Sequence, residues 1–580
     1  MEHGYTDEKN IQMLIGLLKA HGIKKIIISP GTTNLTFVAS VQYDSWFELY
    51  SSVDERSAAY MACGLAAESG EPVCLSCTGA TASRNYIPGL TEAFYRKLPV
   101  LALTSSQPIS RIGSLSAQML DRTNPLNDIC VYSATIPFCN TPDEEWDCSI
   151  KINNGILALK RHGGGPVILN IQQKYSKNFS VKELCAVNKI ERYTYTDLLE
   201  SKMPVLPKGK IAVWVGNHKK MKEKLANSID SFCMANNAVV FTDSTSGYYG
   251  KYRLNYSIVE HQLFNDKEIP DLLIHIGEVS GAYYGHAKNV WRVNPDGELR
   301  DLFQKLRNVF EMEESYFFDY YAAHSVGAES SEYFTECNKK LIEVRSKIPD
   351  LSFSNMWCAS KTAHRIPKGS AVFLGILNSL RCWNCFDFSE GVDCYSNTGG
   401  FGIDGGISSA IGASFTNIDR LYFCITGDLS FFYDMNSLGN RYVGKNFRLM
   451  LVNNGKGTEF RNFSHPGSAF GDDADKFIAA GGHYGNKSPV LVKHYCEDLG
   501  FEYLTASNKE EYLQQVERFV TPEITDKPIL FEIFTESQDE SDAIESVYSI
   551  DVSAKGEVKN MAKRILGEKG VKSIKKILRK

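Results

Sequence analysis

Cysteine, long apolar runs and an excess of one charge are all scarce in this chain. Its 580 residues include only 15 cysteines, which is too few for a disulfide scaffold and indicates reduced thiols. No apolar run approaches the roughly 18 residues that a membrane-spanning helix needs. Lys and Arg number 63 against 68 Asp and Glu, for a net charge of −5. We therefore expect no bulk polyanion-binding surface and no nucleic-acid partner.

The proportions of hydrophobic and charged residues are also informative. Hydrophobic residues make up 43% and charged residues 23% of the chain, as in folded globular proteins, which excludes wholesale disorder. A chain of this length predicts three or four domains. The first ten residues, MEHGYTDEKN, lack the basic-then-apolar layout of a secretion signal. We expect a cytoplasmic protein.

The first third of the chain alternates short apolar strands with helical stretches. Residues 10–21 carry apolar side chains at helical spacing, and Lys25–Ser29 is a β-branched run ending at Pro30-Gly31. Strand, helix and strand in repetition predict an α/β fold with a parallel sheet covered on both faces. The further strands predicted here are 72–77, 99–104 and 166–172.

Two more α/β units follow, so the predicted fold class is three doubly wound parallel-sheet domains. Strands are predicted at 210–215, 238–242 and 271–276, and then at 371–374, 421–426, 448–453 and 529–534. No short-period repeat is present, which argues against a solenoid. The predicted divisions are a first domain at 1–180, a linker at 181–208, a central domain at 209–345, a last domain at 350–540 and a tail at 541–580.

The C-terminal tail differs from the rest in charge. Residues 554–580 hold ten Lys or Arg and two Glu, and Val571, Ile574, Ile577 and Leu578 fall on one face of a short helix. One interpretation is a solvated helix that docks on the acidic body of the protein. The other is an amphipathic contact with an anionic membrane surface or a partner protein.

The most informative segment is ITGDLSFFYDMNSLGNRYVGKNFRLMLVNNGKGTEF, residues 425–460. One apolar strand ends at Gly427-Asp428, and the next ends at Asn453-Asn454. Parallel strands finish at the same edge of a sheet, so Asp428 and Asn454 are expected to converge there. Carboxylate and amide oxygens are ligands that Mg²⁺ prefers, and the helix that opens after Asp428 suits a phosphate.

This segment resembles the metal–diphosphate motif of thiamine diphosphate-dependent enzymes. Asn454 lies 26 positions after Asp428, which is the spacing of that motif. The resemblance implies thiamine diphosphate and Mg²⁺ as cofactors, with Asp428, Asn454 and the carbonyl of Lys456 holding the metal. It also names the three domains, in order, as pyrimidine-binding, central and diphosphate-binding.

The same family places a glutamate beside the cofactor's pyrimidine ring, where it promotes loss of the proton from the reactive carbon. The stretch SVDERSAAYMACGLA, residues 52–66, offers Glu55 before a helix rich in Ala and Gly. Alone, an Asp-Glu-Arg cluster is usually a solvated helix start. With the later motif also present, Glu55 is the predicted catalytic carboxylate.

A third segment, SNTGGFGIDGGISSAIG at 396–412, matches the dinucleotide pattern GxGxxG. We reject that interpretation because no apolar strand immediately precedes it. The resemblance instead implies that this loop lines the cofactor, with Ile403 supporting its two rings. The full set of residues that the resemblance assigns to the cofactor is Glu55, Asn378, Ser379, Gly402, Ile403, Gly427, Asp428, Leu429, Ser430 and Asn454.

Four stretches resemble one branch of the family, the synthase of menaquinone biosynthesis: GDLSFFYDMNSL, the SNTGGFGIDG loop, Ser29-Pro30-Gly31 and Asn378-Ser379. That synthase joins a succinic semialdehyde unit from 2-oxoglutarate to isochorismate. The resemblance covers residue 8 to about residue 535. Four arginines of that branch are replaced here by neutral residues, whereas Glu55 and a second predicted catalytic residue, Gln118, are retained. Each charged contact is worth about 1.5–3 kcal/mol, so a different substrate is expected. The replacing residues, predicted to face the substrate, are Thr33, Gln107, Trp383 and Thr398.

Other residues could restore part of the anion recognition. Arg381 is the main candidate, followed by Arg84 and Arg111, and His465 is the predicted proton-transfer residue, although a lone loop histidine is more often structural. The predicted function is decarboxylation of a 2-oxo acid donor with transfer to an unknown acceptor. A simple decarboxylase and a catalytically silent scaffold remain alternatives. The resemblance also implies a homodimer or homotetramer.

Cysteine spacing leaves one metal alternative. Cys382, Cys385 and Cys394 approach the spacing of a structural zinc site, but no fourth ligand is evident. Cys74 and Cys77 lie in a predicted strand, where packing in the core explains them. Structural zinc is therefore the minor interpretation.

Overall fold

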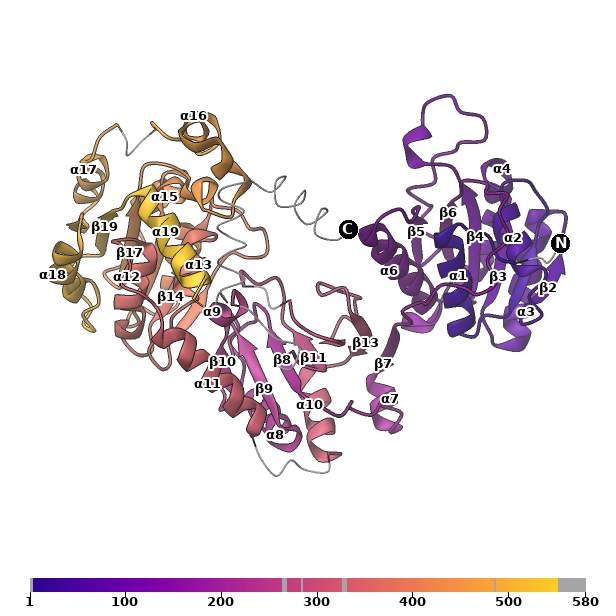
Figure 1. The fold of residues 1–580 in the computed structure, drawn as a ribbon, viewed down its shortest axis with the longest axis horizontal. Helices are drawn as coiled ribbons and strands as arrows, with labels where there is room; N and C mark the ends of the chain where they lie inside the picture. The colour runs from indigo at the N-terminus through magenta and orange to yellow at the C-terminus, as the bar shows by residue number, and fades with distance from the viewer. Residues whose placement is uncertain (1–3, 263–268, 283–284, 326–330, 484–486, 551–580) are drawn as a thin grey trace, which may run out of the picture. The chain divides into compact units, whose positions relative to one another are not determined.

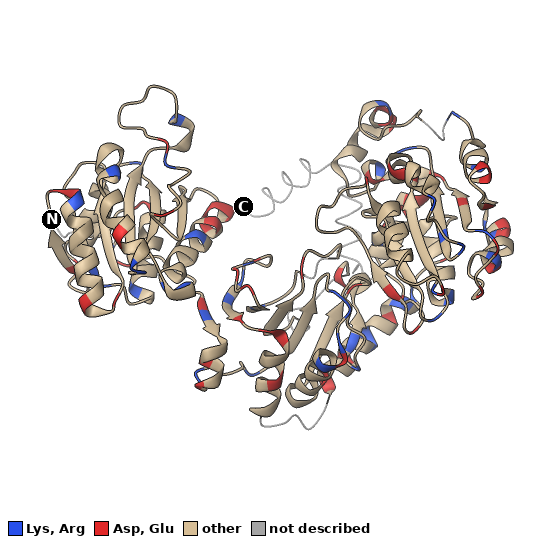
Figure 2. Ribbon diagram, turned by 180° about the vertical axis from the view of Figure 1, so that it is seen from behind, with Lys and Arg blue, Asp and Glu red and all other residues tan. Residues whose placement is uncertain are grey.

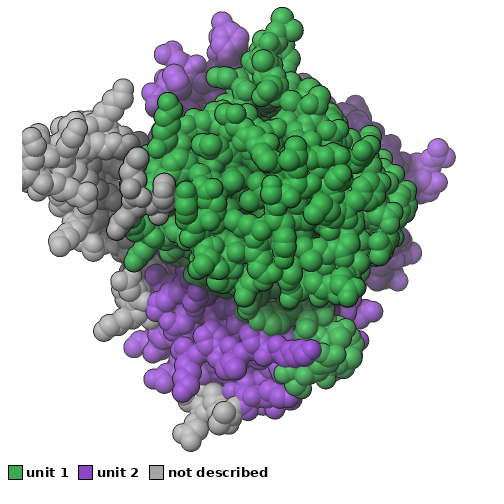
Figure 3. Space-filling view, turned by 90° about the vertical axis from the view of Figure 1, so that its right-hand side faces the viewer, with its two compact units in different colours: residues 1–201, 296–311 green, residues 202–295, 312–580 purple. Residues whose placement is uncertain are grey.

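In a computed structural model, the described residues are 4–262, 269–282, 285–325, 331–483 and 487–550. The chain forms two compact units, coloured separately in Figure 3: unit 1 is 1–201 with 296–311, and unit 2 is 202–295 with 312–580. The three sheets of the molecule consist of parallel strands joined by helices (Figure 1). The predicted fold class is confirmed.

Unit 1 contains the first domain, a six-stranded sheet in the order β2-β1-β3-β4-β6-β5. Neighbouring residues of a strand enter opposite faces: Ile26 packs in one apolar cluster with α1 and α6, and Ile27 in another with α3 and α5. Helices therefore cover both faces. The elements are β1 Lys25–Ile28, β2 Glu48–Ser51, β3 Val73–Cys77, β4 Val100–Ser106, β5 Tyr132–Ile136 and β6 Val167–Gln172, with α1 Lys9–Ala20, α2 Leu35–Val41, α3 Glu55–Ser69, α4 Ala80–Asn85, α5 Ile87–Tyr95 and α6 Pro142–Ala158.

Unit 1 also includes a later pair of strands. β7 (Glu191–Thr194) runs parallel to β13 (Leu306–Glu311) and precedes α7 (Tyr195–Leu199). Trp146 of α6 donates its indole N–H to Asp301 over 3.0 Å, and Arg161 forms an ion pair with Glu298 at 2.8 Å. These contacts attach residues 296–311 to the first domain.

Unit 2 begins with the middle domain, whose strands are ordered β10-β9-β8-β11-β12. The three central strands are buried along their whole length, as expected for a parallel sheet covered on both faces. The elements are β8 Ile211–Val215, β9 Ala238–Thr242, β10 Arg253–Asn255, β11 Leu272–Ile276 and β12 Val290–Asn294, with α8 Glu223–Asn236, α9 Ser257–Glu260, α10 Glu314–Ala323 and α11 Glu332–Ser346.

The last domain of unit 2 has the strand order β15-β14-β16-β17-β19-β18, which places β16 and β17 at the centre. Its strands are β14 Ala371–Leu374, β15 Asp393–Tyr395, β16 Tyr422–Gly427, β17 Phe447–Asn453, β18 Glu502–Ala506 and β19 Ile529–Phe534. Its helices are α12 Asn355–Thr362, α13 Asn378–Trp383, α14 Gly406–Ser414, α15 Asp428–Asp434, α16 Ala474–Phe477, α17 Leu491–Asp498, α18 Lys509–Phe519 and α19 Ser537–Tyr548.

Charged residues lie mostly on helices and loops, while the strands are largely free of them (Figure 2). Arg448 in β17 is an exception: it is fully buried, and its guanidinium donates to the carbonyls of Phe519, Thr521 and Glu523 at 2.5–2.8 Å. These carbonyls lie at and beyond the C-terminal end of α18, where backbone acceptors lack helical partners. The buried cation thus attaches α18 to the sheet.

Every strand predicted from the sequence is present, within two residues at each end. The strands that were not predicted are β2, β5, β7, β10, β12, β13, β15 and β18. The structure differs from the predicted divisions at two places. The range 181–208, predicted as a linker, contains β7 and α7, and α19 occupies much of the first part of the predicted tail.

The basic segment 554–580 lies outside the described residues, so its predicted contacts stay predictions. Among the residues that are described, no helix is both long and apolar enough to span a membrane.

Candidate functional site

An open cavity lies in the last domain, at the C-terminal ends of β14, β16 and β17. Nine residues predicted to bind cofactor or metal line this one cavity: Asn378, Ser379, Ile403, Gly427, Asp428, Leu429, Ser430, Asn454 and Lys456. These residues come from four separate segments of the chain. The parallel sheet brings them together, because its strands all end at the same edge.

Asp428 is the first residue of α15, directly after β16. Its side chain accepts the Leu429 amide N–H over 2.8 Å and is 4% exposed. Burial raises its pKa to about 6, although nearby backbone amides of Leu429, Gly455 and Asn454 oppose that rise. Among the described residues no Lys or Arg forms an ion pair with it. Asp428 is thus a buried carboxylate that lacks a cationic partner.

Asn454 follows the end of β17 and faces the same cavity. Its side-chain oxygen accepts a hydrogen bond from the Thr458 hydroxyl over 2.7 Å, and an amide oxygen has a second lone pair. The Lys456 ammonium is engaged by Asp475 at 2.6 Å, so its charge is already paired.

The oxygen atoms and the open space in the cavity suit the expected Mg²⁺ and diphosphate. A buried carboxylate and an amide oxygen are the ligand types of Mg²⁺, and an added cation would favour the charged form of Asp428. A side chain at Gly427 would meet no atom within 4 Å, so this position leaves open space at the cavity wall. The Thr426 hydroxyl lines the cavity, is buried and has no hydrogen-bond partner.

The loop before α14 follows the three-residue strand β15, Asp393–Tyr395. That strand contains Asp393 and ends at Tyr395, before the GxGxxG match begins at Gly400, so no apolar strand immediately precedes the match. The loop instead belongs to the cavity, because the Ser430 hydroxyl donates to the Ile403 carbonyl over 2.6 Å. Gly402 itself is exposed and is not among the lining residues.

Glu540 on α19 also lines the cavity and was missed by sequence reasoning. Its carboxylate accepts the Asn355 amide N–H at 2.9 and 3.1 Å and the Thr535 hydroxyl at 2.7 Å. The side chain is 1% exposed, and burial raises its pKa to about 7, with the charge of Asp428 contributing. A signal existed in the sequence: Glu540 shares a helical face with the buried residues Ala543, Ile544 and Val547.

Arg381, which was predicted to bind substrate, forms an ion pair and a hydrogen bond with other residues of the protein. It forms a bidentate ion pair with Glu459, one contact of which is 3.0 Å, and it donates to the Asn378 side-chain oxygen over 2.6 Å. Burial lowers the pKa of Arg381, but its hydrogen bond to Glu459 outweighs that effect and the pKa is raised overall. Glu459 rather than Arg381 lines the cavity.

Two further residues predicted to face the substrate are buried among contacts within the protein. Trp383 is fully buried, stacks on Phe388 with ring centroids 6.0 Å apart, and donates its indole N–H to Asn355 over 2.9 Å. Thr398 is 2% exposed and accepts a hydrogen bond from the Asn217 side chain over 2.8 Å. Both side chains are therefore committed to contacts inside unit 2.

His465 lies outside the cavity lining. It is the residue before a 3₁₀ helix, Pro466–Asp473, and its Nδ1 accepts the Gly467 amide N–H over 2.9 Å. Its ring packs edge-on against Phe460 at 5.3 Å between centroids. The visible contacts are those of a residue that caps a turn, and its predicted role in proton transfer stays a prediction.

In unit 1, the predicted residues follow the ends of neighbouring parallel strands. Glu55 is the first residue of α3, is half-buried, and accepts a hydrogen bond from the Asn85 side chain over 3.3 Å. Thr33 accepts the Gly79 amide N–H at 3.3 Å, and Gln107 accepts a hydrogen bond from Arg111 at 2.8 Å. Gln118 is exposed, with a positive φ of 62°. These loops thus share one edge of the first sheet.

The minor zinc interpretation finds no support in the described part of the chain. Cys382, Cys385 and Cys394 are buried. Within the described ranges, no group of three or more His, Cys, Asp or Glu side chains comes together to hold a metal. Burial raises the pKa of all three thiols, which disfavours the thiolate form that binds zinc.

Comparison with known proteins relates the chain to one enzyme family. Residues 9–125 match the family described as thiamine pyrophosphate enzyme, N-terminal TPP binding domain. A 2-succinyl-5-enolpyruvyl-6-hydroxy-3-cyclohexene-1-carboxylate synthase from Phocaeicola vulgatus is 30% identical over 94% of this chain and 98% of its own length. The synthase of the same name from Bacteroides thetaiotaomicron is 29% identical over 94% of this chain and 99% of its own.

Proposed function

Because this chain belongs to the thiamine pyrophosphate enzyme family, with relatives named 2-succinyl-5-enolpyruvyl-6-hydroxy-3-cyclohexene-1-carboxylate synthase, we propose that it decarboxylates a 2-oxo acid and transfers the acyl unit to an acceptor. One observation carries the proposal: Asp428 and Asn454, distant in sequence, line one cavity at the ends of β16 and β17. The family makes the chain a thiamine diphosphate-dependent enzyme, and the donor set supports Mg²⁺ as its metal.

Each part of the cavity has a proposed task. Asp428, Asn454 and the Lys456 carbonyl would hold Mg²⁺, and the open space at Gly427 leaves room for a diphosphate. Ile403 would support the rings of the cofactor, anchored through the hydrogen bond from Ser430. When bound, thiamine diphosphate supplies a nucleophilic carbon and an electron sink for loss of CO₂.

Glu55 is the proposed activating residue. In the family, this carboxylate faces the cofactor site of a second subunit, which supports a homodimer or homotetramer here. Its place at the start of α3 leaves it half-buried within unit 1, so it is available to such a neighbour. The role of Gln118 in binding or proton transfer is proposed on the same resemblance.

The substrate pair is proposed to differ from that of the menaquinone branch. Two carboxylates that form no ion pair among the described residues line the cavity of the last domain: Asp428 and Glu540. Its nearby cations are already paired, Arg381 with Glu459 and Lys456 with Asp475. A cavity of this charge disfavours a substrate with several carboxylates, which supports a less anionic acceptor.

The test is a screen of 2-oxo acids, including pyruvate and 2-oxoglutarate, for CO₂ release by the full chain with Mg²⁺ and thiamine diphosphate. A carboligase would form a new carbon–carbon product only when an acceptor aldehyde is added. A simple decarboxylase would release an aldehyde without dependence on the acceptor. A silent scaffold would bind the cofactor without any turnover.

The matched variant is Glu55→Gln, which keeps side-chain size and removes the charge. We expect cofactor affinity to change little and turnover to fall at least about a hundredfold, within the range for loss of a general acid–base group. Undiminished turnover would remove the proposed role of Glu55. Calorimetry that detects no Mg²⁺-dependent uptake of thiamine diphosphate would remove the whole proposal.

A further inference from the structure

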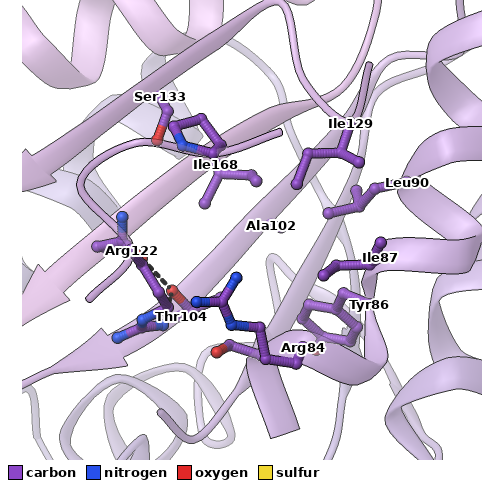
Figure 4. A pocket seen from close by; sticks show the side chains of 13 residues that line it. Arg84, Tyr86, Ile87, Leu90, Ala102, Thr104, Arg122, Ile129, Ser133 and Ile168 are labelled. Atoms are coloured by element: carbon purple, nitrogen blue, oxygen red, sulfur yellow. Dashed lines mark hydrogen bonds between the residues drawn. The ribbon is translucent and has the colours of Figure 1, made fainter. Parts of the chain in front are cut away.

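A second cavity, which is small and open to solvent, lies in unit 1 and shares no lining residue with the cavity of the last domain (Figure 4). Its floor is one face of the sheet, at Ala102 and Thr104 of β4 and Ile168 of β6. Helices α4 and α5 form one wall, and the segment that follows Gln118 forms another. All of its lining residues belong to unit 1.

One end of this cavity is cationic. Arg122 donates to the Thr104 hydroxyl and to the Ser105 carbonyl, both over 2.6 Å, and its Nε is buried without a partner. Thr104 in turn donates to the Asn170 side chain over 2.7 Å, across the β4–β6 register. The guanidinium is therefore fixed in position before any ligand arrives.

Arg84 adds a second positive charge at the same end. It reaches back to donate to the Asp121 carbonyl over 2.9 Å, and Figure 4 shows its guanidinium directed toward Arg122. Burial and the charge of Arg84 lower the pKa of Arg122. In the part of the chain that the structure describes, neither arginine forms an ion pair with an Asp or Glu. Two cations therefore share one end of a cavity without a counter-charge.

The opposite end is apolar. The side chains of Ile87, Leu90, Ile129 and Ile168 point toward the centre of the cavity in Figure 4. Ser133 of β5 closes this side near Ile168. An occupant must therefore combine an anionic group with an apolar body.

We propose that this cavity binds a small monocarboxylic acid with an aromatic or branched aliphatic body. The carboxylate would accept hydrogen bonds from the guanidinium groups of Arg84 and Arg122, since guanidinium pairs strongly with carboxylate. The body would fill the space among the four apolar side chains. A ligand with a second charge would have to bury it against them, which is costly.

The ligand would also be linked to the segment that carries Gln118. Arg122, Pro125 and Ile129 of this segment line the cavity, so occupancy would hold the segment against the sheet. Amide hydrogen exchange of residues 119–129 should slow when ligand is bound, because bound ligand suppresses local opening.

The experiment measures binding of benzoate and of uncharged benzyl alcohol to the full chain, saturated with Mg²⁺ and thiamine diphosphate. We expect benzoate to bind at least about tenfold more tightly than benzyl alcohol, since one charged hydrogen bond is worth that much. Arg84→Gln should weaken benzoate binding about tenfold, and Arg84→Lys should weaken it less. Arg96→Gln, outside the cavity, is the matched control and should leave binding unchanged.

A second variant, Ser133→Leu, tests the same cavity if Arg84→Gln fails to fold. Ser133→Leu keeps both arginines and fills the cavity, and it should abolish benzoate binding and the slowed exchange at 119–129. Equal affinity for benzoate and benzyl alcohol would overturn the proposed ligand class. Undetectable benzoate binding would overturn the site, and so would binding that Asp428→Asn removes and Ser133→Leu leaves intact.

Discussion

Glu55 and Asp428 occupy the same local position in two different domains, yet they differ in burial. Each is the first residue of a helix that follows a parallel strand. Glu55 follows β2, an edge strand, and is half-buried, whereas Asp428 follows β16, a central strand, and is 4% exposed. The place of a strand in its sheet therefore decides how far its own domain buries the acid that follows it.

The difference has a chemical consequence. Burial raises the pKa of Asp428 to about 6, and a bound cation would stabilise the charged form of this carboxylate. Glu55 is half-buried and accepts a hydrogen bond from the Asn85 side chain. A buried acid suits metal binding by its own domain, and a half-open acid suits a role that a neighbouring surface completes.

The largest expected effect comes from Asp428→Asn. The variant keeps the volume and loses the charge, so the Mg²⁺-dependent affinity for thiamine diphosphate should fall at least about a hundredfold, the equivalent of about 3 kcal/mol. Isothermal calorimetry with and without Mg²⁺ measures this loss. Glu55→Gln is the matched comparison, and equal losses in the two variants would contradict the division of roles between them.

A smaller effect is expected from Glu459→Gln, which releases Arg381 from its bidentate ion pair. The freed guanidinium should increase the affinity of the cavity for dicarboxylates such as 2-oxoglutarate about tenfold. Inhibition or turnover by dicarboxylates against pyruvate measures the change. The exposed Glu497→Gln serves as the control, and an unchanged preference would show that Arg381 does not reach the substrate.

The free energy of unfolding should depend on pH in a way that shows the contribution of Glu540. Its pKa rises from an ordinary value of 4.5 to about 7 in the folded protein, so its contribution to stability is fully present below pH 4.5 and is lost as the pH rises through 7. By pH 8 the loss is about 3 kcal/mol. Urea unfolding without cofactor should therefore show wild type losing stability relative to Glu540→Gln between pH 5 and pH 8. The exposed Glu536→Gln should follow wild type.

The smallest effect concerns the start of α3. Asp54 accepts the Arg56 amide N–H over 3.0 Å and the Ser57 hydroxyl over 3.0 Å, and so caps the helix that begins at Glu55. Asp54→Ala should lower the midpoint of thermal unfolding by a small amount and reduce turnover only a few-fold. Thermal unfolding measures the first effect. Ser57→Ala retains the backbone cap and should be closer to wild type.

The sequence predicted the features that depend on local pattern and spacing. The apolar runs gave the long strands, and the spacing from Asp428 to Asn454 predicted two residues that line one cavity. Short edge strands such as β2 and β15 escaped because three or four residues carry little periodicity.

Side-chain direction and long-range pairing could not be predicted in the same way. Trp383 was predicted to face the substrate, but a large indole gains more from burial against Phe388 and Asn355 than from exposure. Arg381 was expected to be free for an anion, and its partner Glu459 lies 78 residues away. Arg84 and Arg122 are far apart in the sequence and come to line one cavity only in the folded first domain.

The pairing of β7 with β13 sets a limit on how the gene can be divided. A fragment that ends at Ser201 would keep β7 but lose the strand beside it, together with the Asp301 that binds Trp146 and the Glu298 that binds Arg161. Its new edge would expose unpaired amides and carbonyls, which invites aggregation. A split-protein or domain-transplant experiment that treats residues 1–201 as autonomous should supply 296–311 as well.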